Sequence, residues 1–350
     1  MKSLLVALSL LPVASAFAAD PELAGYDRFS VSAAHRPARL QGSVWYPAGT
    51  RTYAGFIGKG PVFKGTKALV GAGVRKGRYP IVLFSHGSGG NMDALSWLFS
   101  SLAKKGIIVV GVNHPGSTSG DSSPRRSLQP AERAADLSAA LDHLLNDPYF
   151  SRFIEKNRIV AAGFSLGGAT ALSLGGVTFE PNTYAEYCLK FGDKAQDCVF
   201  FAKGDVDLAV MSDGLAANGR DHRVQAVVSI DPGFTYAVRD ESVERMKLPV
   251  QLISLGQRNL WNAADIGPTG SNLIGKLEHV THVTLSPANH FTFLDECTEQ
   301  GAKILQEEKD DPVCDDPAGV DRAEIHRQIT RAVATFVLNP EPGPSEELEN

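Results

Sequence analysis

A serine framed by glycines is the strongest chemical signal in this sequence. A strand-like apolar run over 158–162 leads into Gly163-Phe-Ser165-Leu-Gly167, and a helical pattern follows it. Such a turn is so tight that a side chain at either glycine would collide with the backbone. It presents the serine hydroxyl above the sheet, at the N-terminus of the next helix. The pattern predicts that Ser165 is a nucleophile.

A nucleophilic serine needs a base, and His290 is the best placed histidine. It lies in the loop after the predicted strand 281–285, so it would reach the sheet edge at which Ser165 is expected. His86, in an earlier loop, is the alternative, but in triads of this arrangement the base follows the serine in the chain. We expect His86 to position its own loop through hydrogen bonds.

A carboxylate must hold the imidazole in the correct tautomer, and it is expected between Ser165 and His290 in the chain. Asp231 directly follows the predicted strand 226–230 and begins an Asp-Pro-Gly turn. Asp265 lies deeper in the loop after the strand 250–254 and is the alternative. We expect Asp231 to complete the triad.

Attack on a carbonyl produces an oxyanion, which fixed N–H groups have to stabilise. The backbone of Leu166, directly after the serine, offers one N–H group. The loop Ser85-His-Gly-Ser88-Gly follows the apolar strand 81–84 and offers the second from Ser88. This chemistry requires neither a metal nor an organic cofactor, and we predict none.

Segments with strand character alternate with helical patterns along most of the chain. This alternation predicts an α/β fold, with a mostly parallel central sheet of about eight strands and helices on both faces. Two extended segments, 29–31 and 40–46, precede the series, and residues 47–79 are expected to be loop. The strands of the series are expected at 81–84, 107–112, 158–162, 226–230, 250–254 and 281–285, with helices at 131–145 and 320–338.

The first residues resemble a secretory signal. Met1-Lys2 is followed by the apolar stretch 4–13 and by Ala16-Phe-Ala18, which fits a cleavage site. We therefore predict that residues 1–18 are a signal peptide and that the mature protein is secreted or periplasmic.

Residues 19–338 are predicted to form a single domain. Within it, residues 177–222 depart from the alternation as an insertion, which is either a lid over the site or a surface excursion. Residues 339–350 are rich in Pro and Glu, and we expect them to be a disordered acidic tail. The sequence gives no indication of the oligomeric state.

Four cysteines lie in the second half of the chain, and they allow three pairings. Pairing of sequence neighbours closes the shortest loops, which gives Cys188–Cys198 and Cys297–Cys314. In an exported protein these are expected to be structural disulfides rather than catalytic thiols or zinc ligands, and no CxxC pair is present.

Composition excludes several classes of function. Of the 350 residues, 43% are hydrophobic and 21% are charged, which is ordinary for a globular protein and argues against wholesale disorder. After the first twenty residues no apolar run is long enough to span a membrane. The net charge is −5 and no strongly basic stretch is present, so a nucleic-acid partner is not expected.

The motifs taken together resemble the α/β-hydrolase superfamily. The stretches 79–117 and 163–170 resemble the platelet-activating-factor acetylhydrolase branch more narrowly. Other segments are similar to the bacterial predicted dienelactone hydrolase group, and the resemblance covers about residues 28–338. These other segments are Trp45-Tyr46-Pro47, Leu248-Pro249-Val250, His290 to Cys297 and Cys314 to Arg322.

The resemblance implies an α/β-hydrolase fold and a secreted serine carboxylic-ester hydrolase. It supports Asp231 as the acid and the N–H groups of Ser88 and Leu166 as the oxyanion donors. The expected substrate is a small or lipid-like ester with a short acyl group. True dienelactone hydrolases use a cysteine nucleophile, whereas this chain has Ser165, so a lactone substrate does not follow from the likeness.

The same triad also serves polyester and phthalate-type esterases, peptidases, amidases and thioesterases, which stay open as alternatives. A non-catalytic binding protein would be expected to lack a triad member, and none is missing from this sequence.

Overall fold

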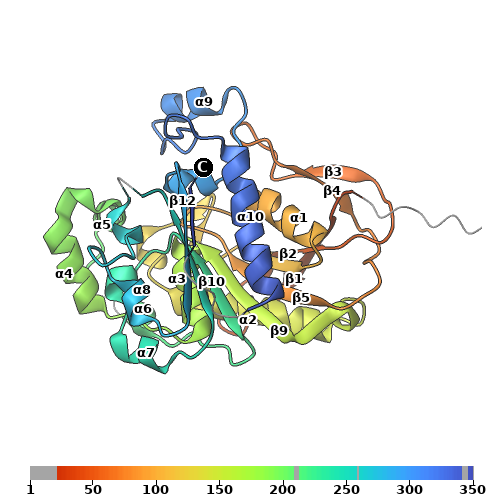
Figure 1. Ribbon diagram of the computed structural model, residues 1–350, viewed down its shortest axis with the longest axis horizontal. Coiled ribbons are helices and arrows are strands. Elements are labelled where there is room, and N and C mark those ends of the chain that lie inside the picture. The colour runs from red at the N-terminus through yellow and green to blue at the C-terminus, as the bar shows by residue number, and fades with distance from the viewer. Residues whose placement is uncertain (1–21, 209–212, 258–259, 341–345, 350) are drawn as a thin grey trace, which may run out of the picture.

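The centre of the protein is a single mixed sheet (Figure 1). The structure is a computed structural model, and it describes residues 22–208, 213–257, 260–340 and 346–349. The described strands of this sheet are β1 Gly25–Val31, β2 Leu40–Tyr46, β3 Ala54–Ile57, β4 Thr66–Val70, β5 Tyr79–Ser85, β6 Ile108–Val112, β9 Ile154–Phe164, β10 Ala226–Ile230, β11 Val250–Leu255, β12 Val280–Ser286 and β13 Glu346–Glu349. They lie in the order β13-β12-β11-β10-β9-β5-β6-β2-β1-β4-β3.

The middle of the sheet is parallel, as the sequence predicts. Strands β6, β5, β9, β10, β11 and β12 all run in one direction. Strand β2 pairs antiparallel with β6 and with β1. The α/β fold with a mostly parallel sheet is therefore confirmed, and the carboxyl ends of its parallel strands meet at one edge.

The prediction that residues 47–79 form loop is wrong for two segments. Strands β3 and β4 pair antiparallel there and extend the sheet beyond β1. Every residue of β3 is exposed or half-buried, because an edge strand has one neighbour and needs little apolar surface. Its weak hydrophobic pattern is the reason that the sequence does not reveal it.

Helices cover both faces of the sheet. On one face lie α1 (Ser96–Lys104) and α10 (Arg322–Leu338), and on the other lie α2 (Pro130–Asn146) and α3 (Leu166–Gly175). Successive side chains of β5 point to opposite faces of the sheet. Val82 and Phe84 join the core under α1 and α10. Ile81 and Leu83 join the core under α2 and α3. Burial of both faces explains why β5 is apolar from Ile81 to Phe84.

The α-helices in the described part of the insertion 177–222 are α4 (Pro181–Phe191), α5 (Gln196–Lys203) and α6 (Asp213–Ala216). A disulfide joins Cys188 to Cys198, as expected. The insertion packs on the loop after β10 through aromatic rings, including Tyr187 on Tyr236 at 4.4 Å and Phe201 on Phe234 at 5.9 Å between centroids.

The second disulfide joins Cys297 to Cys314 and closes a segment that carries α9 (Gly301–Glu308) at the top of Figure 1. This segment is attached to the loop between β3 and β4. Phe63 forms a bridge with Cys297, and the N–H of Lys64 donates to the carbonyl of Glu296 at 2.9 Å. Segments more than 230 residues apart in sequence therefore lie side by side.

The predicted signal peptide, residues 1–18, lies outside the described residues. Of the tail expected to be disordered, residues 346–349 are described as β13, a short strand parallel to β12. Disorder in the remainder of the tail stays a prediction. Within the described ranges, no helix is both long and apolar enough to cross a membrane.

A buried histidine between α1 and α10 generates a prediction about acid stability. His326 stacks on Trp97 with 3.7 Å between ring centroids, and its Nε2 lies 3.0 Å from the carbonyl oxygen of Thr292. Burial lowers the pKa of His326 to about 4 from 6.5. The unfolded chain therefore takes up this proton first as the pH falls, so the free energy of unfolding should decrease between about pH 6.5 and about pH 4.

Denaturant unfolding across this pH window tests the prediction. His326→Phe keeps a ring on Trp97 but cannot titrate, so its unfolding free energy should fall less, by on the order of 1–3 kcal/mol. Equal pH dependence in the wild type and the variant would contradict the assignment.

Candidate active site

Ser165 occupies the sharp turn between β9 and α3. Its backbone has φ 57° and ψ −122°, a conformation that non-glycine residues rarely adopt. A Cβ atom on Gly163 would lie 2.0 Å from the carbonyl oxygen of Gly167, and one on Gly167 would lie 2.0 Å from that of Ser85. Neither position has room for a side chain, and this is why glycine stands on both sides of the serine in the motif.

The structure brings Ser165, His290 and Asp231 together in one chain of hydrogen bonds. His290 Nε2 lies 3.1 Å from Ser165 Oγ, and His290 Nδ1 lies 2.7 Å from Asp231 Oδ2. The other carboxylate oxygen, Oδ1, accepts the N–H of Leu255 at 3.0 Å. The three residues follow β9, β10 and β12, so the parallel sheet delivers them to one edge.

Asp231 and His290 are both shielded from water, with exposed fractions of 2% and 7%. The imidazole of His290 lies close to two aromatic rings, Phe164 at 4.6 Å and Trp261 at 4.3 Å between centroids. Trp261 is nearly parallel to the imidazole, at 18°. Such packing fixes the ring plane that faces Ser165 and strengthens the hydrogen bonds by excluding water.

The turn that carries His290 is held by the segment of the second disulfide. Asn289 caps the short helix His290–Phe293 by accepting the N–H of Thr292 at 3.0 Å. Asn289 Nδ2 also donates to the carbonyl of Asp315 at 2.9 Å, and the hydroxyl of Thr292 donates to Asp316 at 2.8 Å. Residues next to Cys314 thus determine where the imidazole lies.

The two predicted oxyanion donors belong to segments that adjoin the serine. Leu166 is the first residue of α3, and Ser88 is exposed in the loop after β5. A Cβ atom on Gly87 would lie 3.4 Å from the Cβ of Ser165, so this loop runs directly past the nucleophile. Within the described part of the chain, neither the Leu166 nor the Ser88 N–H has an intramolecular acceptor.

A buried guanidinium forms hydrogen bonds to the loop after β5. Arg133 of α2 donates to the carbonyl of His86 and, at 3.0 Å, to the hydroxyl of Ser85. It also donates to Ser117 and, at 3.0 Å, to Thr170 on α3. Burial lowers the pKa of Arg133 to about 9. One side chain therefore ties the predicted oxyanion loop to the helix that begins at the serine.

A second buried cluster adjoins Arg133. His114 lies 2.9 Å from a carboxylate oxygen of Asp136 and 3.0 Å from the hydroxyl of Ser85. Arg36 donates to the other carboxylate oxygen of Asp136 at 2.8 Å. Burial lowers the pKa of His114 to about 4, so this histidine is neutral near pH 7 and serves as a hydrogen-bonding link.

The two alternatives considered for the triad lie elsewhere. His86 is fully buried, with Nε2 3.0 Å from Thr118 Oγ1, and burial holds its pKa well below the usual value. Asp265 accepts the N–H of Gly267 at 3.1 Å within its own loop. Neither is hydrogen-bonded to Ser165 or His290 among the described residues.

Arg133 and Trp261 were not found from the sequence. Neither belongs to a motif: Arg133 lies inside an ordinary helical pattern, and Trp261 lies in a long loop. Only their positions in the fold connect them to the site.

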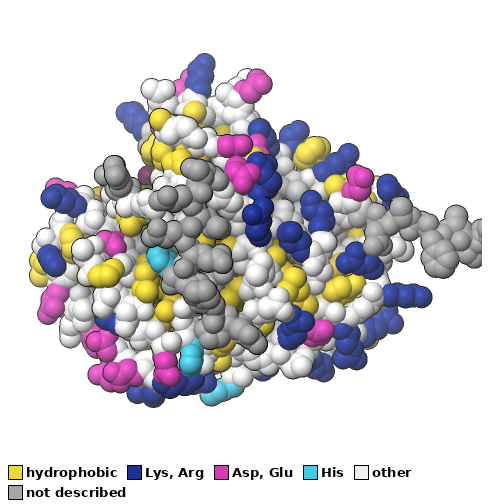
Figure 2. Space-filling view, viewed as in Figure 1, with side chains coloured by type: hydrophobic (Ala, Val, Ile, Leu, Met, Phe, Trp, Pro, Cys, Tyr) yellow, Lys and Arg dark blue, Asp and Glu magenta, His cyan; other side chains and the backbone are white. Residues whose placement is uncertain are grey.

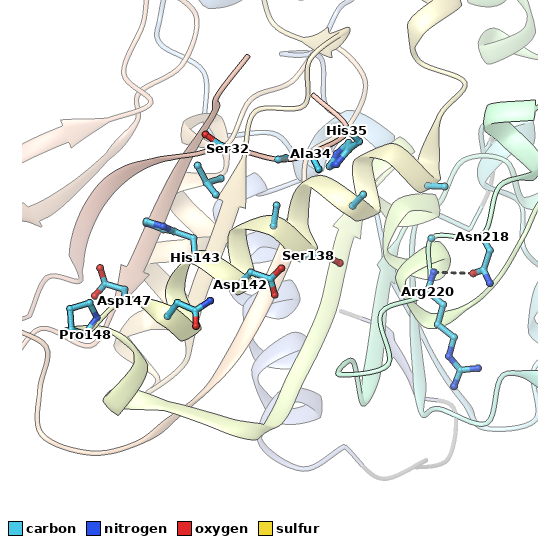
Figure 3. Close-up of a pocket in the computed structure, with 17 residues that line it drawn as sticks. Ser32, Ala34, His35, Ser138, Asp142, His143, Asp147, Pro148, Asn218 and Arg220 are labelled. Carbon is cyan, nitrogen blue, oxygen red and sulfur yellow. Dashed lines mark hydrogen bonds between the residues drawn. The ribbon is translucent and has the colours of Figure 1, made fainter. Parts of the chain in front are cut away.

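A cavity of about 780 Å³ lies between residues 31–35, α2 and residues 218–220 (Figure 3). Alanines of α2 and polar side chains such as His143 and Arg220 line it, and it includes none of the three triad residues. Across the described residues, no group of three or more His, Cys, Asp or Glu side chains is arranged to hold a metal ion.

Comparisons with known proteins show the family of this chain. Residues 82–299 match the family described as the alpha/beta hydrolase family. Curated relatives include Cutinase est1 of Thermobifida alba and Cutinase 2 of Thermobifida cellulosilytica, each 32% identical over 98 residues. That alignment covers 27% of this chain, and 30% and 34% of the two relatives. The chain thus spans about a third of the length of these relatives.

A solved structure, that of a ferulic acid esterase from Streptomyces cinnamoneus, matches over 95% of this chain and 94% of its own, with a TM-score of 0.61. The sequence identity is 19%, so this likeness concerns the fold.

The close contact at Gly167 generates a stability prediction. Gly167→Ala places a methyl group against backbone that cannot give way, so the variant should unfold at least ~2 kcal/mol more easily and lose the Ser165 geometry. Gly55→Ala is the matched control, because its new Cβ would meet only Val70 at 3.7 Å. Thermal unfolding compares the two, and equal stability would contradict the packing described.

Arg133 generates a prediction about the loop after β5. Arg133→Lys keeps the positive charge but cannot make the forked set of hydrogen bonds, so Ser88 should shift relative to Ser165. The kcat of the ester hydrolysis that the sequence predicts should fall on the order of 10- to 100-fold, with KM changing less. Arg223→Lys is the control, an ion-paired arginine outside the site. An unchanged kcat in a folded Arg133→Lys variant would refute this role.

Proposed function

The chain belongs to the alpha/beta hydrolase family, and on that premise we propose that it is a serine carboxylic-ester hydrolase whose catalytic residues are Ser165, His290 and Asp231. The observation that carries the proposal is the continuous pair of hydrogen bonds, 3.1 Å from Ser165 to His290 and 2.7 Å from His290 to Asp231. A hydroxyl, an imidazole and a buried carboxylate in this order are the groups required for nucleophilic attack on an ester.

In the proposed reaction, His290 Nε2 accepts the proton of Ser165 as Oγ attacks the ester carbonyl. Asp231 stabilises the resulting imidazolium through Nδ1. The N–H groups of Ser88 and Leu166 hold the oxyanion of the tetrahedral intermediate. His290 then donates its proton to the departing alcohol, which leaves an acyl-enzyme on Ser165. Water attacks the acyl-enzyme with the same base and releases the acid.

We propose esters with short acyl groups as the substrates. Within the family, the stretches 79–117 and 163–170 favour the platelet-activating-factor acetylhydrolase branch. We further propose that the bridged insertion 177–222 forms a lid or wall of this site, since it packs on the loop that carries Asp231.

Export is part of the proposal. The predicted signal peptide at 1–18 and the two disulfides, Cys188–Cys198 and Cys297–Cys314, are both typical of secreted or periplasmic proteins.

A second candidate is hydrolysis of ester bonds within a polyester. The curated relatives named as cutinases favour it. The same triad chemistry applies, and the two candidates differ in the size of the alcohol and acyl groups that the site admits.

Rates on p-nitrophenyl esters of graded chain length, on matched anilides and on a polyester film test the substrate class. We expect the highest kcat/KM on acetate and butyrate, and Asp231→Asn should lower kcat by on the order of 10⁴. Faster cleavage of anilides than of esters would rule out the proposed class.

The role of Ser88 is testable because it rests on the backbone. Ser88→Ala keeps the N–H group and should retain activity, whereas Ser88→Pro removes it and should lower kcat about 10²- to 10³-fold. Similar kinetics for the two variants, with both folded by circular dichroism, would assign the second donor to another residue.

A further inference from the structure

Positive charge is concentrated in one part of the fold. Residues 51–105 contain nine Lys and Arg against one carboxylate, Asp93, in a chain whose net charge is −5. These residues form β3, β4, β5 and α1 and the loops between them. Figure 2 shows many Lys and Arg side chains over the side where β3, β4, α1 and α10 lie in Figure 1, with few Asp or Glu side chains among them.

The outermost strand, β3, combines this charge with exposed aromatic rings. Tyr53 is 72% exposed and Phe56 is 57% exposed, two of the four large hydrophobic side chains that are exposed among the described residues. Lys59 lies over the Phe56 ring at 5.0 Å, and Lys67 is directly opposite Phe56 in the strand pairing. We call Tyr53, Phe56, Lys59 and Lys67, together with the exposed Arg51, the β3 patch.

A cavity of about 600 Å³ continues the basic surface from β4 into the groove between α1 and α10. It begins at Thr66, the neighbour of Lys67, and its lining includes Lys104, Lys105 and Arg331. Glu296 is its one carboxylate, and it is already paired with Lys64 at 2.8 Å.

Several of the cations on this surface form no ion pair with a carboxylate in the part of the chain that the structure describes. Within the described ranges, no ion pair involves Arg51, Lys59, Lys67, Lys104, Lys105 or Arg331. By contrast, Arg28 is paired with Asp93, and Arg327 of the same groove is paired with Glu324 at 2.6 Å. Cations left unpaired beside one another repel, so this surface favours an external anion.

The aromatic rings favour a membrane over a soluble polyanion. Lysines alone are sufficient to attract a soluble polyanion, and such a partner offers no apolar phase for Phe56 and Tyr53. The interfacial layer of a bilayer accepts aromatic rings while lipid phosphates contact nearby lysines. Proteins that bind membranes from outside use this combination.

We propose that the β3 patch and the adjoining basic groove dock the protein on a membrane surface rich in anionic phospholipid. Phe56 and Tyr53 enter the interfacial layer, and Lys59, Lys67 and the lysines of the groove contact phosphate groups. The proposal is independent of the catalytic assignment, because it includes none of the residues placed in the triad or in the oxyanion loop.

Co-sedimentation of the full chain with vesicles tests the proposal. Vesicles of phosphatidylcholine alone are compared with vesicles that also contain phosphatidylglycerol, at low and high salt. We expect binding only to the anionic vesicles, and weaker binding as salt screens the attraction. Equal binding to both kinds of vesicle, or to neither, would overturn the proposal.

Two double variants separate the charge from the rings. Each lysine near an anionic surface contributes about fivefold to binding, so Lys59→Gln with Lys67→Gln should weaken it about 25-fold. Tyr53→Ser with Phe56→Ser should also weaken binding to the anionic vesicles. The binding that remains should be more sensitive to salt, because it is then electrostatic alone. All four side chains are exposed or half-exposed, so the fold should be preserved, which the far-UV spectrum and hydrolysis of a soluble ester check.

The matched controls lie on α4, where Leu189 is 86% exposed. Leu189→Ser and Lys190→Gln make the same kinds of change on another surface and should leave vesicle binding unchanged. If the controls weaken binding as much as the β3 variants, the docking surface is not the β3 patch. If heparin, a soluble polyanion, binds the protein and anionic vesicles do not, the membrane assignment is wrong.

Discussion

The structure depends on a backbone-to-backbone contact between the end of β5 and the start of α3. Gly167 lies so close to the carbonyl of Ser85 that no side chain fits between them, and Gly163 is equally close to Gly167. This contact holds Ser165 at positive φ and brings the loop after β5 past its side chain. The nucleophile and the loop proposed to hold the oxyanion are thus parts of one rigid unit, which Arg133 ties together from beneath.

The contacts within this rigid unit do not position His290. It follows β12, and its orientation depends on the aromatic rings on either side and on hydrogen bonds from Asn289 and Thr292 to the segment after Cys314. The disulfide at the C-terminal end of the fold therefore contributes to the geometry of the site. This links an expected feature of an exported protein to the proposed chemistry, since stable positioning of the imidazole matters more than its mere presence.

Features that depend on neighbouring residues in the chain could be predicted from the sequence, whereas features that depend on contacts between distant segments could not. Ser165 lies in a local motif, Asp231 directly follows a strand, and His290 lies in the loop after another, so all three could be selected from sequence, and the structure brings their side chains together. Strand β3 was missed because an edge strand carries a weak hydrophobic pattern, and β4 was missed because it is short and only Ala68 and Leu69 of it are buried. Arg133 and Trp261 belong to no motif. The basic face was also missed, because its cations are spread over residues 51–105 and the distant helix α10.

The central claim is that His290 makes the hydroxyl of Ser165 reactive. Mass spectrometry after treatment with an organophosphonate measures this directly, because such reagents add covalently to an activated serine. We expect one adduct, on the peptide that contains Ser165, in the wild type and almost none in His290→Gln. An adduct on a different serine, or equal labelling of Ser165 with and without His290 in folded protein, would contradict the account.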